Sequence, residues 1–400
     1  MNAHVFVVDA DSFPVHRDRL FCGIKNPSKT SIIRKTGLSR PNPSHYGLIA
    51  DLVTLRKGDY VIFYQMRKNE SKLDRGFRGI YKVISEPFFD DSNVDGLPTS
   101  IGQLGSKGKK VLGKCPYCGT TLSENADIKT GDKICKNCRK KLDYHILPNR
   151  ILIEPITVYE EPIDDNTAYI DRNFITKDLT VLWTMLFRKT SGEGRARSIT
   201  HILPEEFNKL KKIFETVCKV SNNNTFQKYI PTNPQRIEIP LDTDTSGELK
   251  IEAFLEAWLM QNIGLKSIDG LDPIIKETAT EKIEYFGNNV LYGIGGEKVD
   301  ILIIYNNGKE RTRALVIELK KGKIKKRDIN QIKDYTKWMS QLVFGDDTLQ
   351  SKKKIEPILI GFKADSEIIN QAKKLITDTK DPILLEYEVK GHELKFRRVL

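Results

Sequence analysis

Residues 298–322 read KVDILIIYNNGKERTRALVIELKKG, and this stretch decides the fold of the C-terminal part of the chain. Two apolar runs rich in β-branched residues flank the turn residues 306–308, which predicts a β-hairpin. Asp300 lies directly opposite Glu318 only if this hairpin is centred on Lys309. A tight Asn-Gly turn would offset the pair, so a longer or bulged loop is required.

Two acids and one amine are expected to converge at this hairpin. Side chains of a strand alternate between faces, so Glu318 and Lys320 project on the same side. Asp300 opens an apolar run, where a carboxylate is costly unless it finds a partner or a metal ion. This set suits Mg²⁺ or Mn²⁺ and a phosphate bound to the ion. An ordinary solvated strand face is the alternative explanation for the Glu-x-Lys pattern alone.

Helices are predicted on both sides of the hairpin, over 248–263 and 328–343, and EPILIGF at 356–362 predicts a buried strand. The order of helix, hairpin, helix and strand is typical of an α/β domain. Each helix carries two polar side chains one turn apart, which either support the site or belong to solvated helix surface. These side chains are Glu252 and Glu256 on the first helix, and Gln331 and Tyr335 on the second.

The segments EAFLEAW, VDILII, VIELKKG and QIKDYTKW, in this order, resemble the PD-(D/E)XK (restriction-endonuclease-like) nucleases over roughly residues 248–365. They are most similar to the C-terminal domain of the archaeal and actinobacterial mismatch-specific endonucleases. The resemblance implies an α/β nuclease domain that hydrolyses backbone phosphodiesters with catalytic Mg²⁺ or Mn²⁺, and a homodimer, because double-strand cutting needs two active sites. It implies catalytic roles for Glu252, Asp300, Glu318, Lys320, Gln331 and Tyr335, with Asp300 and Glu318 as the metal ligands and Lys320 polarising the attacking water.

Four of the six cysteines form two Cys-x-x-Cys pairs separated by sixteen residues. This spacing matches a four-thiolate metal site and predicts structural Zn²⁺, with iron as the alternative metal. The segment at about 108–145 is therefore interpreted as a zinc ribbon inserted between strands. Its expected ligands are Cys115, Cys118, Cys135 and Cys138.

The N-terminal half is mostly β. KGDYVIFYQMR, RGFRGIYKVISEPFF and RILIEPITVYEEPI resemble the PUA-like superfamily, particularly its EVE and YTH branches, over roughly 1–218. This resemblance implies a β-barrel domain that accepts an extruded, modified base in an aromatic pocket. Aromatic core residues would give the same pattern. Because the mismatch endonucleases have a different N-terminal module, mismatch specificity does not carry over. The expected pocket residues are Ser12, Phe13, Tyr64, Gln65 and Trp183.

The formal net charge of +12 predicts a surface that attracts polyanions, and either a nucleic-acid interface or plain solubility would explain it. The polar segment 219–247 is the best linker candidate, which divides the chain into 1–218, 219–247 and 248–400. Phosphate contacts are expected from basic side chains in a glycine-containing segment at 188–198 and in a basic segment at 320–328, namely Arg188, Arg195, Arg197, Lys323 and Lys325.

The sequence thus predicts an α+β multidomain, metal-dependent endonuclease. Its expected substrate is double-stranded DNA with modified or abnormal bases, cut in restriction-like defence or DNA repair. Two alternatives stay open: a nuclease acting on RNA, and a catalytically inert nucleic-acid-binding protein. The chain begins without a basic leader and contains no membrane-length apolar run, and its cysteines are paired as in metal sites, so a cytoplasmic (intracellular) location is expected.

Overall fold

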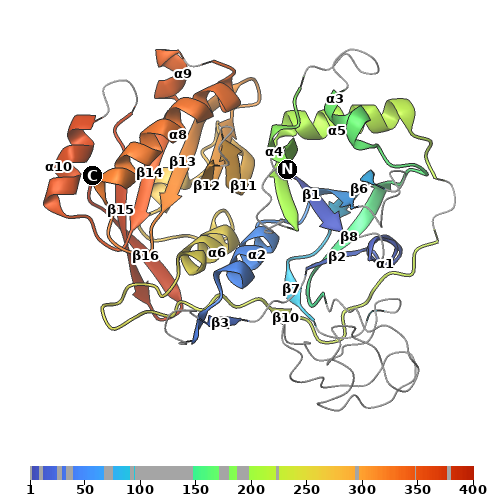
Figure 1. Cartoon of the computed structure of the whole chain (residues 1–400), viewed down its shortest axis with the longest axis horizontal. Coiled ribbons are helices and arrows are strands. Elements are labelled where there is room, and N and C mark those ends of the chain that lie inside the picture. Colours follow the sequence, from blue (N-terminus) through green and yellow to red (C-terminus); the bar gives the residue numbers. More distant parts are fainter. Residues whose placement is uncertain are drawn as a thin grey trace.

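The computed structural model describes residues 2–8, 12–24, 29–32, 39–66, 75–90, 94, 147–170, 180–186, 198–221, 225–292, 297–346, 348–375 and 380–400. Two β-sheets lie side by side in this structure, and helices cover both (Figure 1). The architecture is therefore mixed α+β, which confirms the fold class predicted from the sequence. The expected zinc ligands Cys115, Cys118, Cys135 and Cys138, and the basic residues Arg188, Arg195 and Arg197, fall outside the described residues.

The first sheet has the order β10-β7-β8-β6-β5-β1-β9, with β2 paired to β8. β1 runs parallel to β5, whereas β9 runs antiparallel to β1. Its strands are β1 (Ala3–Val8), β2 (Phe21–Ile24), β5 (Tyr60–Gln65), β6 (Gly76–Val83), β7 (Phe88–Phe89), β8 (Asn149–Thr157), β9 (Ile199–Ile202) and β10 (Gln235–Arg236). A separate two-stranded ribbon is formed by β3 (Thr30–Ile32) and β4 (Ser39–Pro41).

The first sheet is open among the described residues, which form no closed barrel. Closure would require its two edge strands, β9 and β10, to pair. β10 spans only two residues, and the other edge faces the second sheet, where Tyr285 donates a hydrogen bond to the backbone oxygen of His201 at 3.2 Å. An added Cβ at Gly287 would lie 3.0 Å from the His201 side chain, so the glycine permits this close approach.

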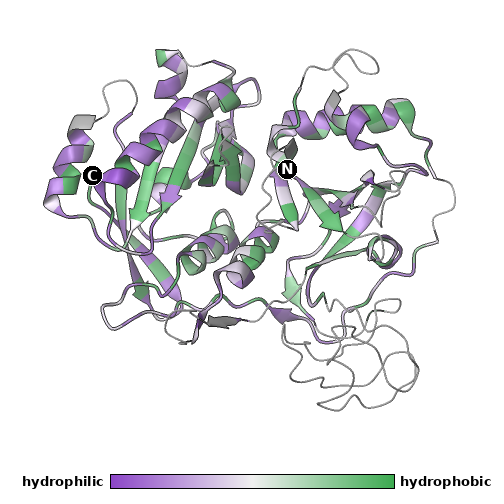
Figure 2. Ribbon diagram, viewed as in Figure 1, coloured by the Kyte–Doolittle hydropathy of each residue, from purple (hydrophilic) through white to green (hydrophobic). Residues whose placement is uncertain are grey.

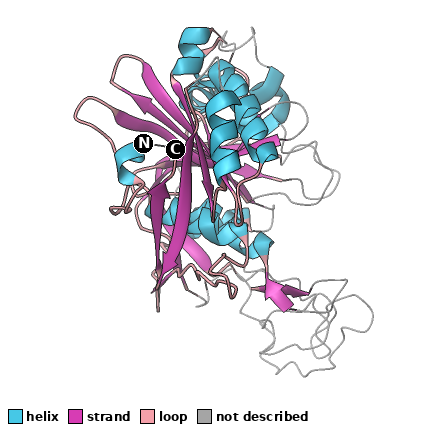
Figure 3. Ribbon diagram, turned by 90° about the vertical axis from the view of Figure 1, so that its left-hand side faces the viewer, coloured by secondary structure: helices cyan, strands magenta, loops and turns pink. Residues whose placement is uncertain are grey.

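The second sheet has the order β11-β12-β13-β14-β15-β16. The pairs β13–β14 and β14–β15 are parallel and the others are antiparallel. Figure 3 shows its long strands from the side with helices beside them. The strands are β11 (Lys282–Tyr292), β12 (Glu297–Asn306), β13 (Arg311–Leu319), β14 (Ile355–Gly361), β15 (Ile383–Lys390) and β16 (Glu393–Arg398).

Helices α6 and α8 cover opposite faces of the second sheet. Ile317 and its face neighbours pack with α6 in one hydrophobic cluster, whereas Val316 and its neighbours pack with α8 in another. Figure 2 shows hydrophobic strands beneath α8, while much of α8 is hydrophilic. The helices are α1 (Phe13–Arg19), α2 (Pro43–Val53), α3 (Asp165–Ile170), α4 (Trp183–Leu186), α5 (Pro204–Val217), α6 (Glu252–Asn262), α7 (Asp272–Ile275), α8 (Lys326–Phe344), α9 (Leu349–Lys353) and α10 (Ser366–Leu375).

The two halves share one hydrophobic core where α2 packs against α6. The rings of Tyr46 and Phe254 meet edge-on with their centroids 4.7 Å apart. The segment predicted as a linker also contributes to this core through buried Ile237, Ile239 and Leu241. Burial of these apolar side chains holds the segment against the core, although its polar composition had predicted a linker. Among the described residues, no helix is both long and apolar enough to cross a membrane.

Candidate active site at the end of the β12–β13 hairpin

The register of the hairpin brings Asp300 and Glu318 to the same end of the second sheet. Ile301 pairs with Ile317, so Asp300 and Glu318 are opposite each other one position further along. This register is centred on Lys309, and a β-bulge between Tyr305 and Asn306 accommodates the longer turn. The bulged loop that the sequence required is therefore present.

Glu318 is buried and pairs with a cation. Its side chain is 2% exposed, and its Oε1 receives a hydrogen bond from the ammonium of Lys320. Its Oε2 is also buried and has no hydrogen-bond partner among the described residues. A buried carboxylate oxygen without a partner is costly, so Glu318 Oε2 is suited to accept a proton, a cation or a donor from a ligand.

Asp300 and Glu252 are held close to Glu318 by backbone donors. Asp300 Oδ2 accepts a hydrogen bond from the Leu319 amide at 2.7 Å. Glu252, in the first turn of α6, accepts one from the Lys321 amide at 3.1 Å. Both acids are thus fixed to the chain that leaves β13, although they come from a different strand and a helix.

Burial raises the pKa values of all three carboxylates, and neighbouring acids add to this shift. Loss of solvent around Asp300, and then the charges of Glu318 and Glu252, raise the pKa of Asp300 well above its usual range. Burial and the charge of Glu252 raise the pKa of Glu318, although Lys320 partly opposes this shift. Burial also raises the pKa of Glu252, again against the effect of Lys320. Negative charge is therefore in excess at this end of the sheet.

The cation of this site keeps its charge. Burial alone would lower the pKa of Lys320, but the charges of Glu318, Asp300 and Glu252 outweigh burial and raise it. One ammonium thus faces three carboxylates. The donor set of buried and half-buried carboxylate oxygens matches the preference of Mg²⁺ and Mn²⁺ for oxygen ligands.

No group of three or more His, Cys, Asp or Glu side chains in the described part of the chain has the arrangement needed to enclose a metal ion. Asp300 and Glu318 form a pair, and the conformations of their oxygens are set by Leu319 and Lys320. The unpartnered Oε2 of Glu318 and the raised pKa values nonetheless fit a site that is neutralised by an added divalent cation.

Gln331 and Tyr335 lie on α8 and contact each other. The Gln331 amide donates a hydrogen bond to the Tyr335 hydroxyl, and Tyr335 is buried in the cluster that contains Val316. Glu318 projects on the same face of β13 as Val316, because residues two apart share a face. Both α8 side chains therefore belong to the face of the sheet that carries the acidic pair.

The basic residues after β13 are mostly exposed. Lys323 is 57% exposed and lies 3.3 Å from the Asp365 carboxylate, and Lys325 precedes the first turn of α8. Lys321 pairs with Glu248 at 3.1 Å. These side chains follow one another in the segment that connects β13 to α8.

The residues expected to form a base pocket are not brought together. Phe13 is 4% exposed and packs against Phe63 in one hydrophobic cluster, whereas Tyr64 belongs to a different cluster. Neighbouring residues of β5 point to opposite faces, so Phe13 and Tyr64 cannot line one cavity together. In this structure Phe13 and Tyr64 therefore pack in two separate hydrophobic clusters.

The other expected pocket residues also have structural partners. The Tyr64 hydroxyl donates a hydrogen bond to Asp165 at 2.8 Å, and Gln65 is buried. Ser12 begins α1 and accepts a backbone hydrogen bond from His16. Trp183 donates from its ring nitrogen to the Leu291 carbonyl of β11 at 3.1 Å, so it lies at the junction of the two sheets.

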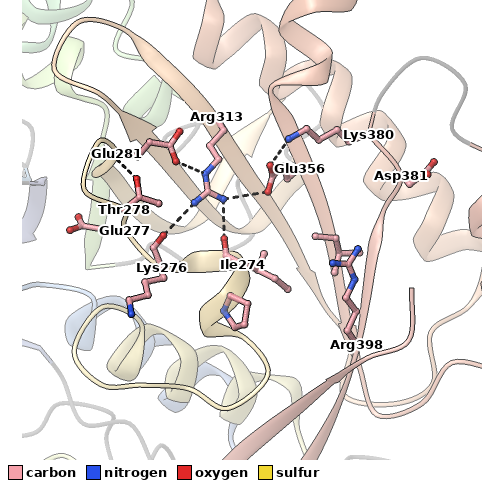
Figure 4. A pocket seen from close by; sticks show the side chains of 12 residues that line it. Ile274, Lys276, Glu277, Thr278, Glu281, Arg313, Glu356, Lys380, Asp381 and Arg398 are labelled. Carbon is pink, nitrogen blue, oxygen red and sulfur yellow. Dashed lines mark hydrogen bonds and ion pairs between the residues drawn. The ribbon is translucent and has the colours of Figure 1, made fainter.

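A separate hollow of about 660 Å³ lies at the other end of β13 (Figure 4). Arg313 points into it and contacts Glu281 at 3.1 Å, the Ile274 carbonyl at 2.9 Å and Glu356 at 3.4 Å. Lys380 also pairs with Glu356. Because its charged groups neutralise one another, this hollow is stabilised internally and does not share the charge excess at Asp300.

Sequence reasoning missed Asn288 and Asn289. They stand in the apolar strand β11, and the amides of both donate to the Glu256 carboxylate, from Asn288 at 2.6 Å. Asn289 has a positive φ of 53°. Two consecutive asparagines inside an apolar strand were the available signal, because buried amides require partners.

No family model matches the chain, and no curated protein matches it significantly. A hypothetical protein from Leishmania major aligns with 54% of this chain and 95% of its own, at 11% identity and a TM-score of 0.28. A Pseudomonas putida protein aligns with 53% and 98%, at 10% identity and a TM-score of 0.25. Human THYN1, solved in complex with 5-methylcytosine-containing DNA, aligns with 52% and 94%, at 11% identity and a TM-score of 0.23. These TM-scores are too low to assign a shared fold or function.

Proposed function

We propose that the chain is a metal-dependent DNA endonuclease that hydrolyses backbone phosphodiesters at Asp300, Glu318 and Lys320. The observation that carries the proposal is the pair of facing carboxylates on β12 and β13, next to a lysine on the same chain segment. The raised pKa values of both acids support it, because such shifts concentrate at functional sites.

Each residue of the site has a distinct role in this proposal. Asp300 and Glu318 would hold Mg²⁺ or Mn²⁺, which would supply Lewis-acid activation of water and of the scissile phosphate. Lys320 keeps its proton and lies against Glu318, where its ammonium neutralises the charge that grows on the phosphate in the transition state. Glu252 adds an outer acid, fixed by the Lys321 amide.

The substrate class follows from charge. The net charge of +12 and the exposed lysines beyond β13 favour a nucleic-acid backbone over a small phosphate ester. We assign recognition of modified or abnormal bases to the N-terminal half, in restriction-like defence or DNA repair. Its resemblance to the PUA-like superfamily supports this assignment, and we propose that the cysteines of the same half hold a structural Zn²⁺. We also propose that the chain cuts duplex DNA as a homodimer.

The test is cleavage of a set of duplexes that differ in one base modification or lesion, with Mg²⁺ or Mn²⁺ and with products mapped on both strands. We expect cleavage by the wild type, and a loss of about 10²–10³-fold or more for Glu318→Gln and Lys320→Met. Glu310→Gln, an exposed carboxylate at the tip of the same hairpin, is the matched control and should cleave normally. If the wild type leaves every duplex intact under both metals, the DNA endonuclease proposal fails.

The same variants separate the alternatives. A catalytically inert binder would retain DNA in a mobility-shift assay but show no cleavage that Glu318→Gln could abolish. A nuclease acting on RNA would cleave single-stranded or duplex RNA of the same sequences, with the same dependence on Glu318 and Lys320. Light scattering of the protein alone and with duplex measures the proposed homodimer.

A further inference from the structure

A buried chain of hydrogen bonds runs from the first sheet to the candidate active site. It begins at Asp59, passes through His4 of β1 and His201 of β9, and reaches Asn288 of β11. Asn288 then donates to Glu256 of α6. The histidines and the asparagine are at most 4% exposed. The chain therefore crosses the junction between the two sheets without contact with bulk water.

The first end of the chain fixes the proton on Nε2 of His4. This nitrogen lies 3.1 Å from Asp59 Oδ2. Burial would raise the pKa of Asp59, but hydrogen bonds from His4 and from the amides of Asn2 and Arg56 outweigh burial and lower it. Asp59 is therefore ionised and can only accept, so His4 donates from Nε2.

The other end fixes the proton on Nε2 of His201. The amide nitrogen of Asn288 lies 3.1 Å from the Asp51 carboxylate and 2.6 Å from the Glu256 carboxylate. Both carboxylates accept, so the amide oxygen of Asn288 faces Nε2 of His201 at 2.8 Å. A carbonyl oxygen also only accepts, and His201 must donate from Nε2.

The two remaining imidazole nitrogens face each other. Nδ1 of His4 lies 2.7 Å from Nδ1 of His201, and the rings are edge-on at 89°. A neutral imidazole has one N–H, which each ring already uses at Nε2. Two bare nitrogens would repel at this distance, so a hydrogen bond requires one additional proton. The pair then carries one positive charge, between the carboxylate of Asp59 and the carboxylates that receive Asn288.

We propose that His4 and His201 share this single proton, and that Asn288, held by the cationic pair, acts together with Asn289 to position Glu256 beside the catalytic carboxylates. Glu256 lies one turn from Glu252 on α6, and its charge acts on Asp300. This inference rests on the proposed nuclease function. Under it, the N-terminal half is required for the geometry of the cleavage site as well as for binding.

Asn289 provides the sharpest test because its backbone conformation can be kept. Its φ of 53° lies in the left-handed region, which lets its amide reach the same carboxylate as Asn288. Asn289→Gly tolerates this φ while removing the amide. We expect kcat to fall by about 10–100-fold, and the affinity for Mn²⁺, measured by calorimetry, to fall by a similar factor. KM for DNA should stay within about twofold of the wild type, since no phosphate contact is removed.

The second measurement observes the protonation of the histidine pair in the wild-type protein. With ¹⁵N-histidine labelling of the whole chain, we expect both Nε2 nitrogens to carry protons and the two Nδ1 nitrogens to share one. Single substitutions His4→Gln and His201→Gln assign the signals, and His392→Gln, an exposed histidine, is the control with unchanged kcat. A spectrum showing one ring with Nδ1–H and a bare Nε2 would overturn the shared proton.

The outcomes separate the two proposals. Wild-type kcat and wild-type Mn²⁺ affinity in Asn289→Gly would overturn the positioning role. Absence of cleavage by the wild-type protein itself would overturn the nuclease proposal, whereas the Mn²⁺ affinities and the imidazole spectra would still decide whether the chain of hydrogen bonds positions Glu256.

Discussion

The two ends of the β12–β13 hairpin carry charged residues in opposite balance. At the end with the turn, Arg311 contacts Glu284 at 3.1 Å and Arg313 contacts Glu281 at 3.1 Å. At the end with Asp300, several carboxylates meet the single ammonium of Lys320. The same two strands therefore support one neutralised cluster and one cluster with excess negative charge.

The difference is visible in the direction of the pKa shifts. A hydrogen bond from Thr312 and then the guanidinium of Arg313 lower the pKa of Glu281. Loss of solvent and neighbouring carboxylates raise the pKa of Asp300. An acid whose pKa is lowered in the folded state stabilises the fold as part of an ion pair. An acid whose pKa is raised lowers the stability of the fold at neutral pH unless a cation binds beside it. We therefore assign structural roles to the first end and chemistry to the second.

Substitution of one carboxylate at each end should separate these roles most strongly. For Asp300→Asn we expect the rate of DNA cleavage to fall by about 10²–10³-fold, because one of the two proposed metal ligands is removed. Glu284→Gln, which removes a carboxylate from the neutralised end, should cleave within about twofold of the wild type. Single-turnover cleavage with saturating Mg²⁺ measures both. Equal losses in the two variants would contradict the division of the hairpin.

Substitution of Arg313 should lower stability and leave cleavage unchanged. For Arg313→Met we expect the free energy of unfolding to fall by about 2–3 kcal/mol, since Glu281, Glu356 and the Ile274 carbonyl lose a charged donor. Urea denaturation measures the change, with Lys309→Met at the exposed turn as the control. Normal cleavage below the melting temperature is expected, and an unchanged unfolding midpoint would argue against the stabilising role.

Added cations should stabilise only the acidic end. At a Mn²⁺ concentration of about 100 times its dissociation constant, binding to the folded state adds about 2.7 kcal/mol. We expect the melting temperature of the wild type to rise with Mn²⁺ and that of Asp300→Asn to respond little. Arg313→Met should respond as strongly as the wild type, although from a lower starting point. If Mn²⁺ raised the melting temperature of Asp300→Asn as much as that of the wild type, the cation would bind at a site other than Asp300.

The hairpin shows why part of this site was predictable. Strand periodicity predicted that Glu318 and Lys320 share a face, whereas the pairing of Asp300 with Glu318 also required a bulged loop centred on Lys309, which the structure contains. The charge balance of the Arg313 cluster could not be predicted, because Glu281 comes from the loop before β11 and Glu356 comes from β14. The position of a side chain along one strand is local information, whereas its partners across a sheet depend on the tertiary fold.

The arrangement of the aromatic residues in the N-terminal half could not be predicted from the sequence. Phe13 and Tyr64 were expected to share a pocket, but the alternation of β5 separates them. His4, Asp59 and His201 gave no signal, since they are distant in sequence and meet only when β1 pairs with β5 and β9. The sequence shows which residues are aromatic or polar, but it does not show which of them become neighbours in the folded protein.

The smallest expected effect is a difference in the sign of the pH dependence of stability without divalent cations. A folded-state pKa that is raised, as at Asp300, means that the folded state binds more protons than the unfolded state above the unfolded value of about 3.9. Stability therefore falls as pH rises through this window, and Asp300→Asn should flatten that fall and raise the melting temperature by a few degrees.

Glu281 has a lowered pKa, so it contributes stability that is present above the unfolded value of about 4.3 and lost as pH falls through its folded value. Glu281→Gln should accordingly flatten the loss of stability on the acid side, and thermal melting curves across pH in EDTA measure both slopes. If both variants changed the slope in the same direction, the two ends of the hairpin would not differ in charge balance, and the assignment of chemistry to the Asp300 end would lose its physical basis.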